Sequence, residues 1–458
     1  MKTIDVGSAI DKARWSGYQK LLIFATALTI ILDGIDNQII GPTIPALMKE
    51  WNLPRGAFQN VLAAGPFGMM FGGLFGGMLG DRVGRRNALL GSVISFAVIT
   101  LGISFVHSVD ALVVLRFLAG LGLGGAMPNA AVLASEYVPR AKRALAVTVT
   151  IVCVPLGGTL AAYTAGPVID GSGWRTLFQL AGILPVIVGL SLFFVLPESP
   201  KYLAGRRERW PELRRLLGRF GHNIPEDASF VVADSAGKKK VSIGSLFQGS
   251  YLRDTVGLFG SFFFCLMANY ISISWLVTFL RDEKGFAQTP AGNILTGYNL
   301  GGVAGALFAA VVIQRFGSRF SMLALCVMSA AGGILLGFMQ LDPKATVFLH
   351  IPVLKLDVTA LFLMVAITGG LMNAVQTTMY ALAAHVYPTE IRATGVGIAV
   401  AVGRVGHVLS AYAGAWAMNG GQVRYFGSWA IGMVIVFCTL AVVGRHIERN
   451  SAVVPAGH

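Results

Sequence analysis

Two carboxylates lie where the surrounding chain avoids charge. The stretch LDGIDNQIIG (32–41) contains Asp33 and Asp36, and it directly follows the uncharged run LLIFATALTII (21–31). Side chains three residues apart on a helix project about 60° apart, so both aspartates share one side of the segment. A carboxylate inside a membrane is costly, and it commonly faces a cavity or a partner and carries protons. The spacing therefore suggests reversible proton binding, and the alternative is a structural ion pair with another helix.

Two arginines, Arg116 and Arg404, lie deep inside the apolar segments defined below, and each needs a nearby anion. Arg404 lies in the sequence GRVG, whose small residues leave room for a ligand. Its planar guanidinium could bind a carboxylate through two hydrogen bonds. The alternative for Arg404 is permanent pairing with Asp33 or Asp36. For Arg116, a purely structural ion pair is the alternative to a role in coupling.

The segments that hold these residues have the composition of membrane helices. Only 13% of the 458 residues are charged and 55% are hydrophobic, with a mean hydropathy of +0.68. Soluble domains carry about 25% charged residues. Apolar windows of about 20 residues predict membrane-spanning helices. We therefore predict an all-α membrane protein with twelve transmembrane helices, at 21–41, 57–79, 88–107, 110–133, 144–165, 176–196, 255–280, 291–313, 320–340, 357–383, 394–418 and 423–444.

The distribution of charge predicts the orientation. The net charge is +14, but most of the 36 Lys and Arg residues lie in one set of alternating loops, which argues against nucleic-acid binding. This bias places both termini and the 197–254 loop in the cytoplasm and suits a bacterial inner membrane protein. The first apolar run has no cleavage pattern, so we expect a retained helix rather than a signal peptide. All four cysteines fall within the predicted spans, so we expect no disulfide.

The two halves of the chain repeat one another. GMLGDRVGRR (77–86) follows the second span and AVVIQRFGSR (310–319) follows the eighth, and Gly68 and Gly72 align with Gly301 and Gly305 at the same offset. A second repeat pairs EYVPRAKRA (136–144) with HVYPTEIRA (385–393). Parallel repetition of six-span halves is the plan of a secondary transporter, with the substrate expected near the midplane between the halves.

This repeat predicts five parts: a tail at 1–20, a six-helix half at 21–196, a linker at 197–254, a second half at 255–444 and a tail at 445–458. The linker contains RRERWPELRRLLGRF (206–220) and a KKK run at 238–240. Apolar residues recur there at helical spacing and make a short amphipathic surface helix plausible. They are Trp210, Leu213, Leu217 and Phe220.

Several motifs resemble those of the major facilitator superfamily. GMLGDRVGRR matches every fixed position of the superfamily's signature for the loop between helices 2 and 3, RFLAGLGLGG (116–125) resembles its fourth-helix motif, and PESPKYL (197–203) is similar to the end of helix 6 in several member families. The resemblance implies a twelve-helix fold, a proton-coupling role for Arg116 and a cytoplasmic gate. The implied gate residues are Gly77, Asp81, Arg82, Gly84, Arg85, Arg86, Glu136, Arg143 and Arg392.

Within this gate, we expect Gly77 to permit close helix packing and Asp81 to favour a helix N-terminus. The alternative for the loop arginines is ordinary positive-inside charge. For Glu136 and Arg143, the alternative is a local surface pair. His385, at the end of the tenth span, could titrate, but a surface position is the simpler interpretation.

DGID (33–36) resembles the signature of the aromatic acid:proton symporters, and SEYVP (135–139) and YPTEIRATGVGIAVAVGRVG (387–406) fit that family. The resemblance implies proton-coupled uptake of aromatic carboxylates such as hydroxybenzoates or protocatechuate, as in aromatic hydrocarbon catabolism. Such a ligand needs a slot for its ring with a few polar groups. Candidates besides Arg404 are Asn37, Tyr270, Trp275, Tyr298, Asn299, Asn373, Gln376 and Tyr380. For each aromatic residue among them, the alternative is packing or lipid contact.

The sequence contains no motif that predicts an enzyme. We find no nucleotide-binding loop, metal-ligand cluster or nucleophile triad, and GLGLGG (120–125) lies in an apolar helix without a preceding strand. We expect a monomer in the lipid bilayer, without cofactor or metal, that binds an aromatic carboxylate and protons. The competing functions are a porter of sugars, organic cations or other organic acids with the same fold and, less favoured, a membrane sensor without transport.

Overall fold

A computed structural model describes residues 3–12, 15–222, 224–225, 228–231, 243–249, 251–352, 356–388 and 391–448. The KKK run at 238–240 lies outside these residues. The chain forms two compact units. One comprises Met1–Ala46 and Asn60–Lys238, and the other comprises Leu47–Gln59 and Lys239–His458.

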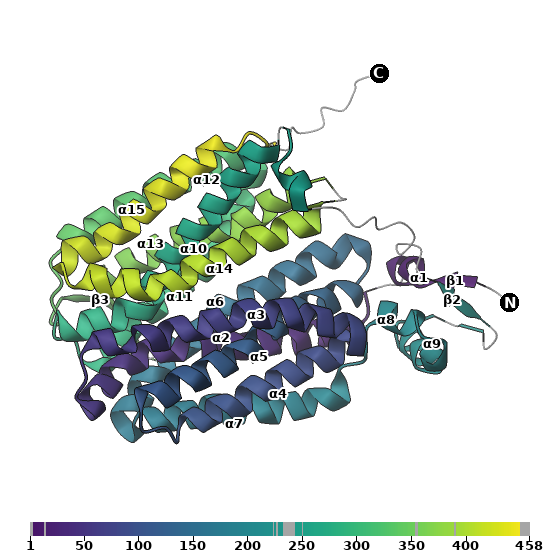
Figure 1. Ribbon diagram of the computed structural model, residues 1–458, viewed down its shortest axis with the longest axis horizontal. Helices are drawn as coiled ribbons and strands as arrows, with labels where there is room; N and C mark the ends of the chain where they lie inside the picture. Colours follow the sequence, from purple (N-terminus) through teal and green to yellow (C-terminus); the bar gives the residue numbers. More distant parts are fainter. Residues whose placement is uncertain are drawn as a thin grey trace. The chain divides into compact units, whose positions relative to one another are not determined.

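Within the described residues, twelve helices are long and apolar enough to cross a membrane (Figure 1). Six belong to the first half of the chain: α2 (Gly17–Trp51), α3 (Gln59–Val83), α4 (Arg85–Ile103), α5 (Val109–Glu136), α6 (Arg140–Ser172) and α7 (Trp174–Val195). The second half contributes α10 (Tyr251–Asp282), α11 (Gln288–Phe316), α12 (Ser318–Phe338), α13 (Ala360–Val386), α14 (Arg392–Met418) and α15 (Gly421–Val442). Each predicted span is therefore present, and most of the helices extend beyond the predicted window.

Local chemistry explains several helix ends. Ser108 accepts a hydrogen bond from the Ala111 amide at 3.3 Å and caps α5. Gly84, with φ +104°, separates α3 from α4, and Gly317, with φ +80°, separates α11 from α12. These left-handed angles favour glycine, so the repeated motif places the same helix break in both halves.

Glycine also explains how neighbouring helices approach. A Cβ atom on Gly68 or Gly72 of α3 would overlap the carbonyl oxygens of Phe117 and Leu121 on α5. The aligned glycines of α11 repeat this arrangement: Gly301 faces the carbonyl of Ala366, and Gly305 faces that of Gly370, both on α13. Small residues allow such close backbone contact between membrane helices. The sequence repeat therefore corresponds to a repeated helix crossing within each unit.

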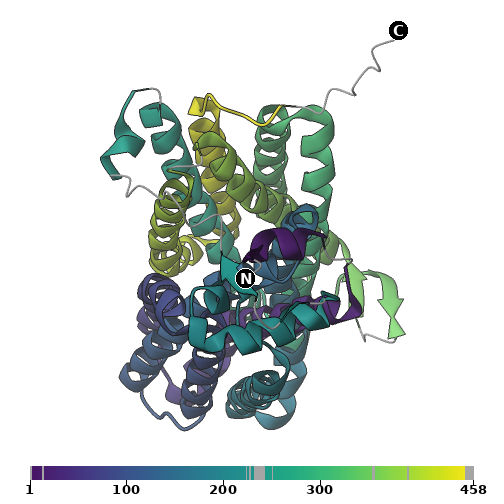
Figure 2. The ribbon, with the colours of Figure 1, turned by 90° about the vertical axis from the view of Figure 1, so that its right-hand side faces the viewer.

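The structure adds two strand pairs outside the twelve spans. The strands β3 (Val347–Ile351) and β4 (Leu356–Thr359) pair in antiparallel fashion at the edge of the second unit (Figure 2). The span predicted at 357–383 consequently begins later, at Ala360, where Thr359 accepts a hydrogen bond from the Phe362 amide at 3.2 Å. Hydropathy did not distinguish the strand β4 from the helix that follows it, because Leu356 and Val358 of the strand are buried apolar residues like those of the helix.

The N-terminal segment and the linker pack together in the first unit. The strand β1 (Thr3–Asp5) pairs in parallel with β2 (Ser229–Val231), and α1 (Val6–Lys12), α8 (Pro200–Ala204) and α9 (Trp210–Arg219) gather around them (Figure 1). The amphipathic helix is thus present as α9, but its apolar face is not a free surface. Its buried residues join a protein core with Val6 and Ile10, and they are Leu213, Leu216, Leu217 and the following Phe220.

Candidate functional site

The most deeply buried charged pair lies inside the first unit. Asp36 of α2 and Arg116 of α5 form an ion pair with 3.4 Å between Oδ2 and Nη1, and their side chains are 0% and 2% exposed. The same guanidinium nitrogen lies 3.4 Å from the Asp36 carbonyl oxygen. Thr100 of α4 donates its hydroxyl to Asp36 Oδ1. Two neighbouring helices therefore contribute polar groups to this carboxylate of α2, while Asp33 is buried one helical turn earlier.

Glycine creates the space for this pair. The Arg116 guanidinium lies against Gly65 of α3, where a Cβ atom would be 3.1 Å from Nη2. On the other side of α2, Gly34 faces Gly157 of α6, and a Cβ atom on Gly34 would overlap the Val154 carbonyl. Gly34 therefore allows α6 to approach α2 closely. The carboxylate is held between close helices, and an ion in such a place is stable only with its partners.

A second polar network surrounds the break between α3 and α4. Arg85 pairs with Asp81 four residues earlier, and its Nη1 lies 3.2 Å from Asn129 Oδ1 of α5 and 3.3 Å from the Gly77 carbonyl. Asn129 in turn donates to the Gly76 carbonyl at 2.9 Å. The motif residues therefore tie the ends of α3 and α4 to α5.

Two expectations for this motif are wrong in detail. Gly77 does not provide close packing, because a Cβ atom there would meet nothing within 4 Å, whereas one on the preceding Gly76 would overlap Gly125. Asp81 does not favour a helix N-terminus, because it lies in the last turn of α3, before the break at Gly84.

The carboxylate at the start of α4 belongs instead to Glu198, which follows α7. Its Oε1 accepts the Arg86 amide at 2.9 Å and the Ser199 amide at 2.8 Å, and the side chain is fully buried. Its other oxygen lies against Gly84, where a Cβ atom would overlap it. Such an acceptor satisfies a donor that the first helical turn leaves open and complements the helix dipole.

The remaining gate candidates have separate partners. Glu136, at the end of α5, accepts a hydrogen bond from the Ser199 hydroxyl. Arg143 pairs at 3.3 Å with Asp11 of α1, which also accepts the Arg140 amide at 2.6 Å. The structure thus places Glu136 and Arg143 in different contacts rather than in one surface pair. Two further candidates lie nearer the surface: Arg82 is exposed with its carbonyl accepting the Tyr202 hydroxyl at 3.1 Å, and Arg392 donates to the Tyr387 carbonyl at 3.2 Å.

In the second unit, polar and aromatic candidates gather around Arg404 of α14. Tyr380 of α13 is hydrogen-bonded to Gln376, and the Arg404 charge acts on its hydroxyl. Tyr270 of α10 stacks on His407 of α14, with 3.2 Å between ring centroids and 14° between ring planes. Arg404, Gln376, Tyr380 and Tyr270 all keep part of their surface exposed. An arginine beside two tyrosines offers both charge and ring contacts to a ligand.

Other candidates in this unit are more deeply buried. Tyr298 of α11 is inaccessible and donates to Asn269 at 2.7 Å, with Asn373 also hydrogen-bonded to it. Trp275 is inaccessible too, and its Nε1 donates to the Ala411 carbonyl at 3.1 Å. Both rings are therefore packed against other parts of the protein. The structure does not support a direct ligand contact by Trp275 or Tyr298. Asn299 is buried as well.

Two further residues singled out in the sequence are accessible. Asn37 of α2 keeps part of its surface exposed, as a side chain that binds a ligand requires. His385, near the end of α13, is exposed, as the simpler interpretation of the sequence expected.

Sequence reasoning missed four polar residues of these clusters: Thr100, Asn129, Glu198 and His407. Glu198 had a usable indication, since it lies in the PESPKYL motif. For the other three, the only indication was a polar side chain within an apolar helix, which does not identify its partner.

Twelve apolar helices in two halves with repeated glycine crossings define a multi-pass integral membrane protein of the secondary-transporter class. The family model described as the Major Facilitator Superfamily matches residues 26–289 and 257–456. The chain belongs to this superfamily, and it is a transporter rather than an enzyme.

Individual relatives indicate which transporters of the superfamily the chain resembles. The chain is 34% identical to the 4-hydroxybenzoate transporter PcaK of Pseudomonas putida over 421 residues, which cover 90% of this chain and 89% of the relative. It is 31% identical to the gallate transporter of Pseudomonas putida over 439 residues, which cover 96% and 92%. Among solved structures, the inward open xylose transporter XylE from E. coli matches with a TM-score of 0.71 at 18% identity, covering 94% of this chain and 97% of that one, which supports the fold alone. The chain is thus a superfamily transporter related to aromatic acid transporters.

Proposed function

We propose that this protein imports aromatic carboxylates of the hydroxybenzoate or protocatechuate type together with protons, by alternating access. We place it in a bacterial inner membrane with both termini in the cytoplasm, from the distribution of Lys and Arg among the loops. The halves 21–196 and 255–444 would be the moving bodies, with 197–254 as their linker. We expect it to act as a monomer.

The observation that carries the proposal for the proton is the buried pair of Asp36 and Arg116. An ionised carboxylate in this place depends on the guanidinium and on the Thr100 hydroxyl. Protonation would remove the attraction between the two charges and leave Arg116 free to rearrange. Asp33, buried on the same helix, is the second candidate for the transported proton.

The cluster around Arg404 supports the proposal for the substrate. An arginine recognises a carboxylate through two parallel hydrogen bonds, and the neighbouring Tyr380 and Tyr270 offer ring contacts. Gln376 would add a hydrogen bond to a ring hydroxyl, and Asn37 of α2 stays a further candidate for substrate contact. The names of the 4-hydroxybenzoate and gallate transporters agree with this chemistry.

The network of Asp81, Arg85 and Asn129 supports a gating role for the motif between α3 and α4. We assign Arg82, Gly84, Arg86, Glu136 and Arg143 to the same gate, and we assign a gating role to Arg392 at the aligned position of the second half. Residues that tie helix ends together can bias the balance between two access states without touching the substrate.

Uptake into proteoliposomes tests the proposal. An acidic exterior should drive protein-dependent accumulation of 4-hydroxybenzoate, and a protonophore should abolish it, with protein-free vesicles correcting for passive diffusion. Asp33→Asn and Asp36→Asn should each lose accumulation, and at least one should keep ligand binding. One proton per monoanion would be electroneutral, whereas a second would add a response of about 2.3 kcal/mol per 100 mV. Accumulation of a sugar or an organic cation, without any aromatic acid signal, would refute the substrate class.

A further inference from the structure

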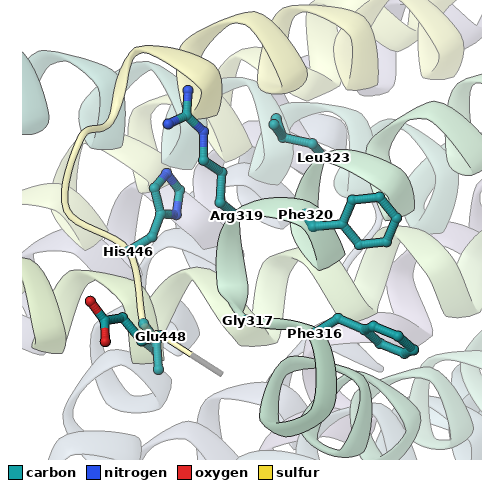
Figure 3. Close-up of a pocket in the computed structure, with 8 residues that line it drawn as sticks. Phe316, Gly317, Arg319, Phe320, Leu323, His446 and Glu448 are labelled. Atoms are coloured by element: carbon teal, nitrogen blue, oxygen red, sulfur yellow. The ribbon is translucent and has the colours of Figure 1, made fainter. Parts of the chain in front are cut away.

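A cavity lies at the start of α12, in the second unit, away from the residues assigned above (Figure 3). Its volume is about 590 Å³. The two helices that border it, α11 and α12, both qualify as membrane spans and are joined by Gly317 alone. The cavity therefore opens at the membrane boundary. The lining side chains used below are Phe316, Arg319, Phe320, Leu323, His446 and Glu448.

The segment that follows α15 builds one wall of this cavity. The Ser318 amide donates to the Ile447 carbonyl at 2.9 Å, and the Ile447 amide donates to Ser318 Oγ at 2.8 Å. Earlier in the same segment, the Gly444 amide donates to the buried carboxylate of Asp254 at 2.6 Å, and Arg445 Nη1 lies 3.4 Å from that carboxylate. Hydrogen bonds therefore hold this segment at both of its ends. They fix the wall of the cavity in place.

His446 lines the cavity as an uncharged ring. Its Nε2 lies 3.0 Å from the Val443 carbonyl, which can only accept, and its Nδ1 lies 3.2 Å from the Ser318 hydroxyl. Burial lowers the pKa of His446, and the charge of Arg319 acts in the same direction, whereas the hydrogen bond to the Val443 carbonyl and the charge of Asp254 oppose this. The ring is therefore neutral near pH 7.

The charged lining consists of one cation and one anion. Arg319 is exposed to the cavity and has no ion-pair partner within the part of the chain that the structure describes. It lies in the first turn of α12, where the helix dipole also favours an anion. Glu448 lies on the opposite wall and is exposed (Figure 3). The site consequently offers a place for a phosphate and a separate place for a cation.

An apolar surface continues from this charged site along α12. Phe316 is 53% exposed and Phe320 is 66% exposed, and both rings point away from His446 (Figure 3). Val327 and Ile334 follow Phe320 at intervals of seven residues and are also exposed. Residues seven apart share one face of a helix, so the stripe runs from the cavity into the apolar span.

We propose that this cavity binds the headgroup of an aminophospholipid, with the phosphate on Arg319 and the α12 N-terminus, the ammonium on Glu448, and an acyl chain along Phe320 and the exposed stripe. Arginine binds phosphate oxygens in a forked geometry, and a carboxylate accepts hydrogen bonds from a primary ammonium. A choline headgroup lacks those ammonium hydrogens, and a glycerol headgroup lacks the charge. The site thus selects phosphatidylethanolamine over both.

Native mass spectrometry of the full chain in neutral detergent tests this selection. The lipids are dioleoyl phosphatidylethanolamine, phosphatidylcholine and phosphatidylglycerol, and inorganic phosphate is a fourth probe. The wild-type chain should retain one phosphatidylethanolamine more tightly than either other lipid. Arg319→Gln should weaken its binding about fivefold, the effect of one basic residue at a lipid surface. Glu448→Gln should remove the preference over phosphatidylglycerol while phosphatidylglycerol binding is kept or improved.

Arg315→Gln is the matched control, because Arg315 is an exposed arginine at the same boundary that lies over Phe316 and does not line the cavity. It should leave phosphatidylethanolamine binding near the wild-type level. Equal losses in Arg315→Gln and Arg319→Gln would mean diffuse attraction and overturn the site. Stronger binding of phosphatidylglycerol by the wild-type chain would overturn the ammonium contact. Full competition by inorganic phosphate at equal concentration would show a phosphate site instead of a lipid site.

Discussion

The Asp36–Arg116 pair gives the sharpest test of the buried site. Removing either charge leaves the other without its partner among three close helices, with both side chains at most 2% exposed. Breaking a buried ion pair in this way costs about 3–5 kcal/mol. We therefore expect Asp36→Asn and Arg116→Gln each to lower the free energy of unfolding by an amount in this range.

The double variant Asp36→Asn/Arg116→Gln should be more stable than the sum of the two losses. It leaves two neutral amides that can share a hydrogen bond, so no uncompensated charge stays buried. Coupling between contacting residues reaches about 0.5–3 kcal/mol, and a pair this buried should fall in the upper half of that range. Gradient-driven accumulation should nevertheless be absent in Asp36→Asn and in the double variant, because neither has a carboxyl group at position 36.

Reversible unfolding in mixed micelles, followed by circular dichroism, measures this cycle. The control is Arg209→Gln, which breaks the exposed pair of Arg209 and Glu212, whose side chains are 31% and 43% exposed. Such a surface pair contributes about 0–1 kcal/mol, so its loss should be small. Additive losses at positions 36 and 116, within about 0.5 kcal/mol, would refute the energetic coupling. Normal accumulation by Asp36→Asn would refute the role of Asp36 as the proton carrier.

Three further predictions concern the helix ends and the helix crossings. Gly76→Ala should destabilise the protein by about 1–3 kcal/mol through overlap with a neighbouring backbone, whereas Gly77→Ala, in open space, should be tolerated; equal melting temperatures would contradict the packing. Glu198→Gln should remove a charged acceptor from the Arg86 amide and alter labelling of single cysteines in the gate, and an unchanged labelling pattern would exclude a gating effect. His446 has a lowered pKa, so the unfolded chain takes up its proton at higher pH than the native state does. Stability should therefore fall on acidification below about pH 6.5, and by less in His446→Gln; identical profiles would remove this contribution.

The amino-acid sequence alone determines the twelve helices, the two halves and the superfamily. Hydropathy sums over about 20 residues, so it detects a span without knowledge of its neighbours. The glycine repeats and the motif between α3 and α4 are equally local. The motif also aligns Gly84 with Gly317, and in the structure both take the positive φ of the helix break, which few other residues adopt. Asp33 and Asp36 stand out by type alone, since charge is rare in such helices.

Only the tertiary structure decides which of these residues meet. Arg116 and Arg404 were both possible partners for the first-span aspartates, and the crossing of α2, α4 and α5 pairs Arg116 with Asp36. The same holds for Glu198, which reaches the start of α4 because the chain after α7 returns to it. Likewise, α9 has the pattern of a surface helix, but the N-terminal segment covers its apolar face. Sequence patterns report the preferences of single segments, whereas ion pairs and covered faces depend on distances between segments that are remote in the chain.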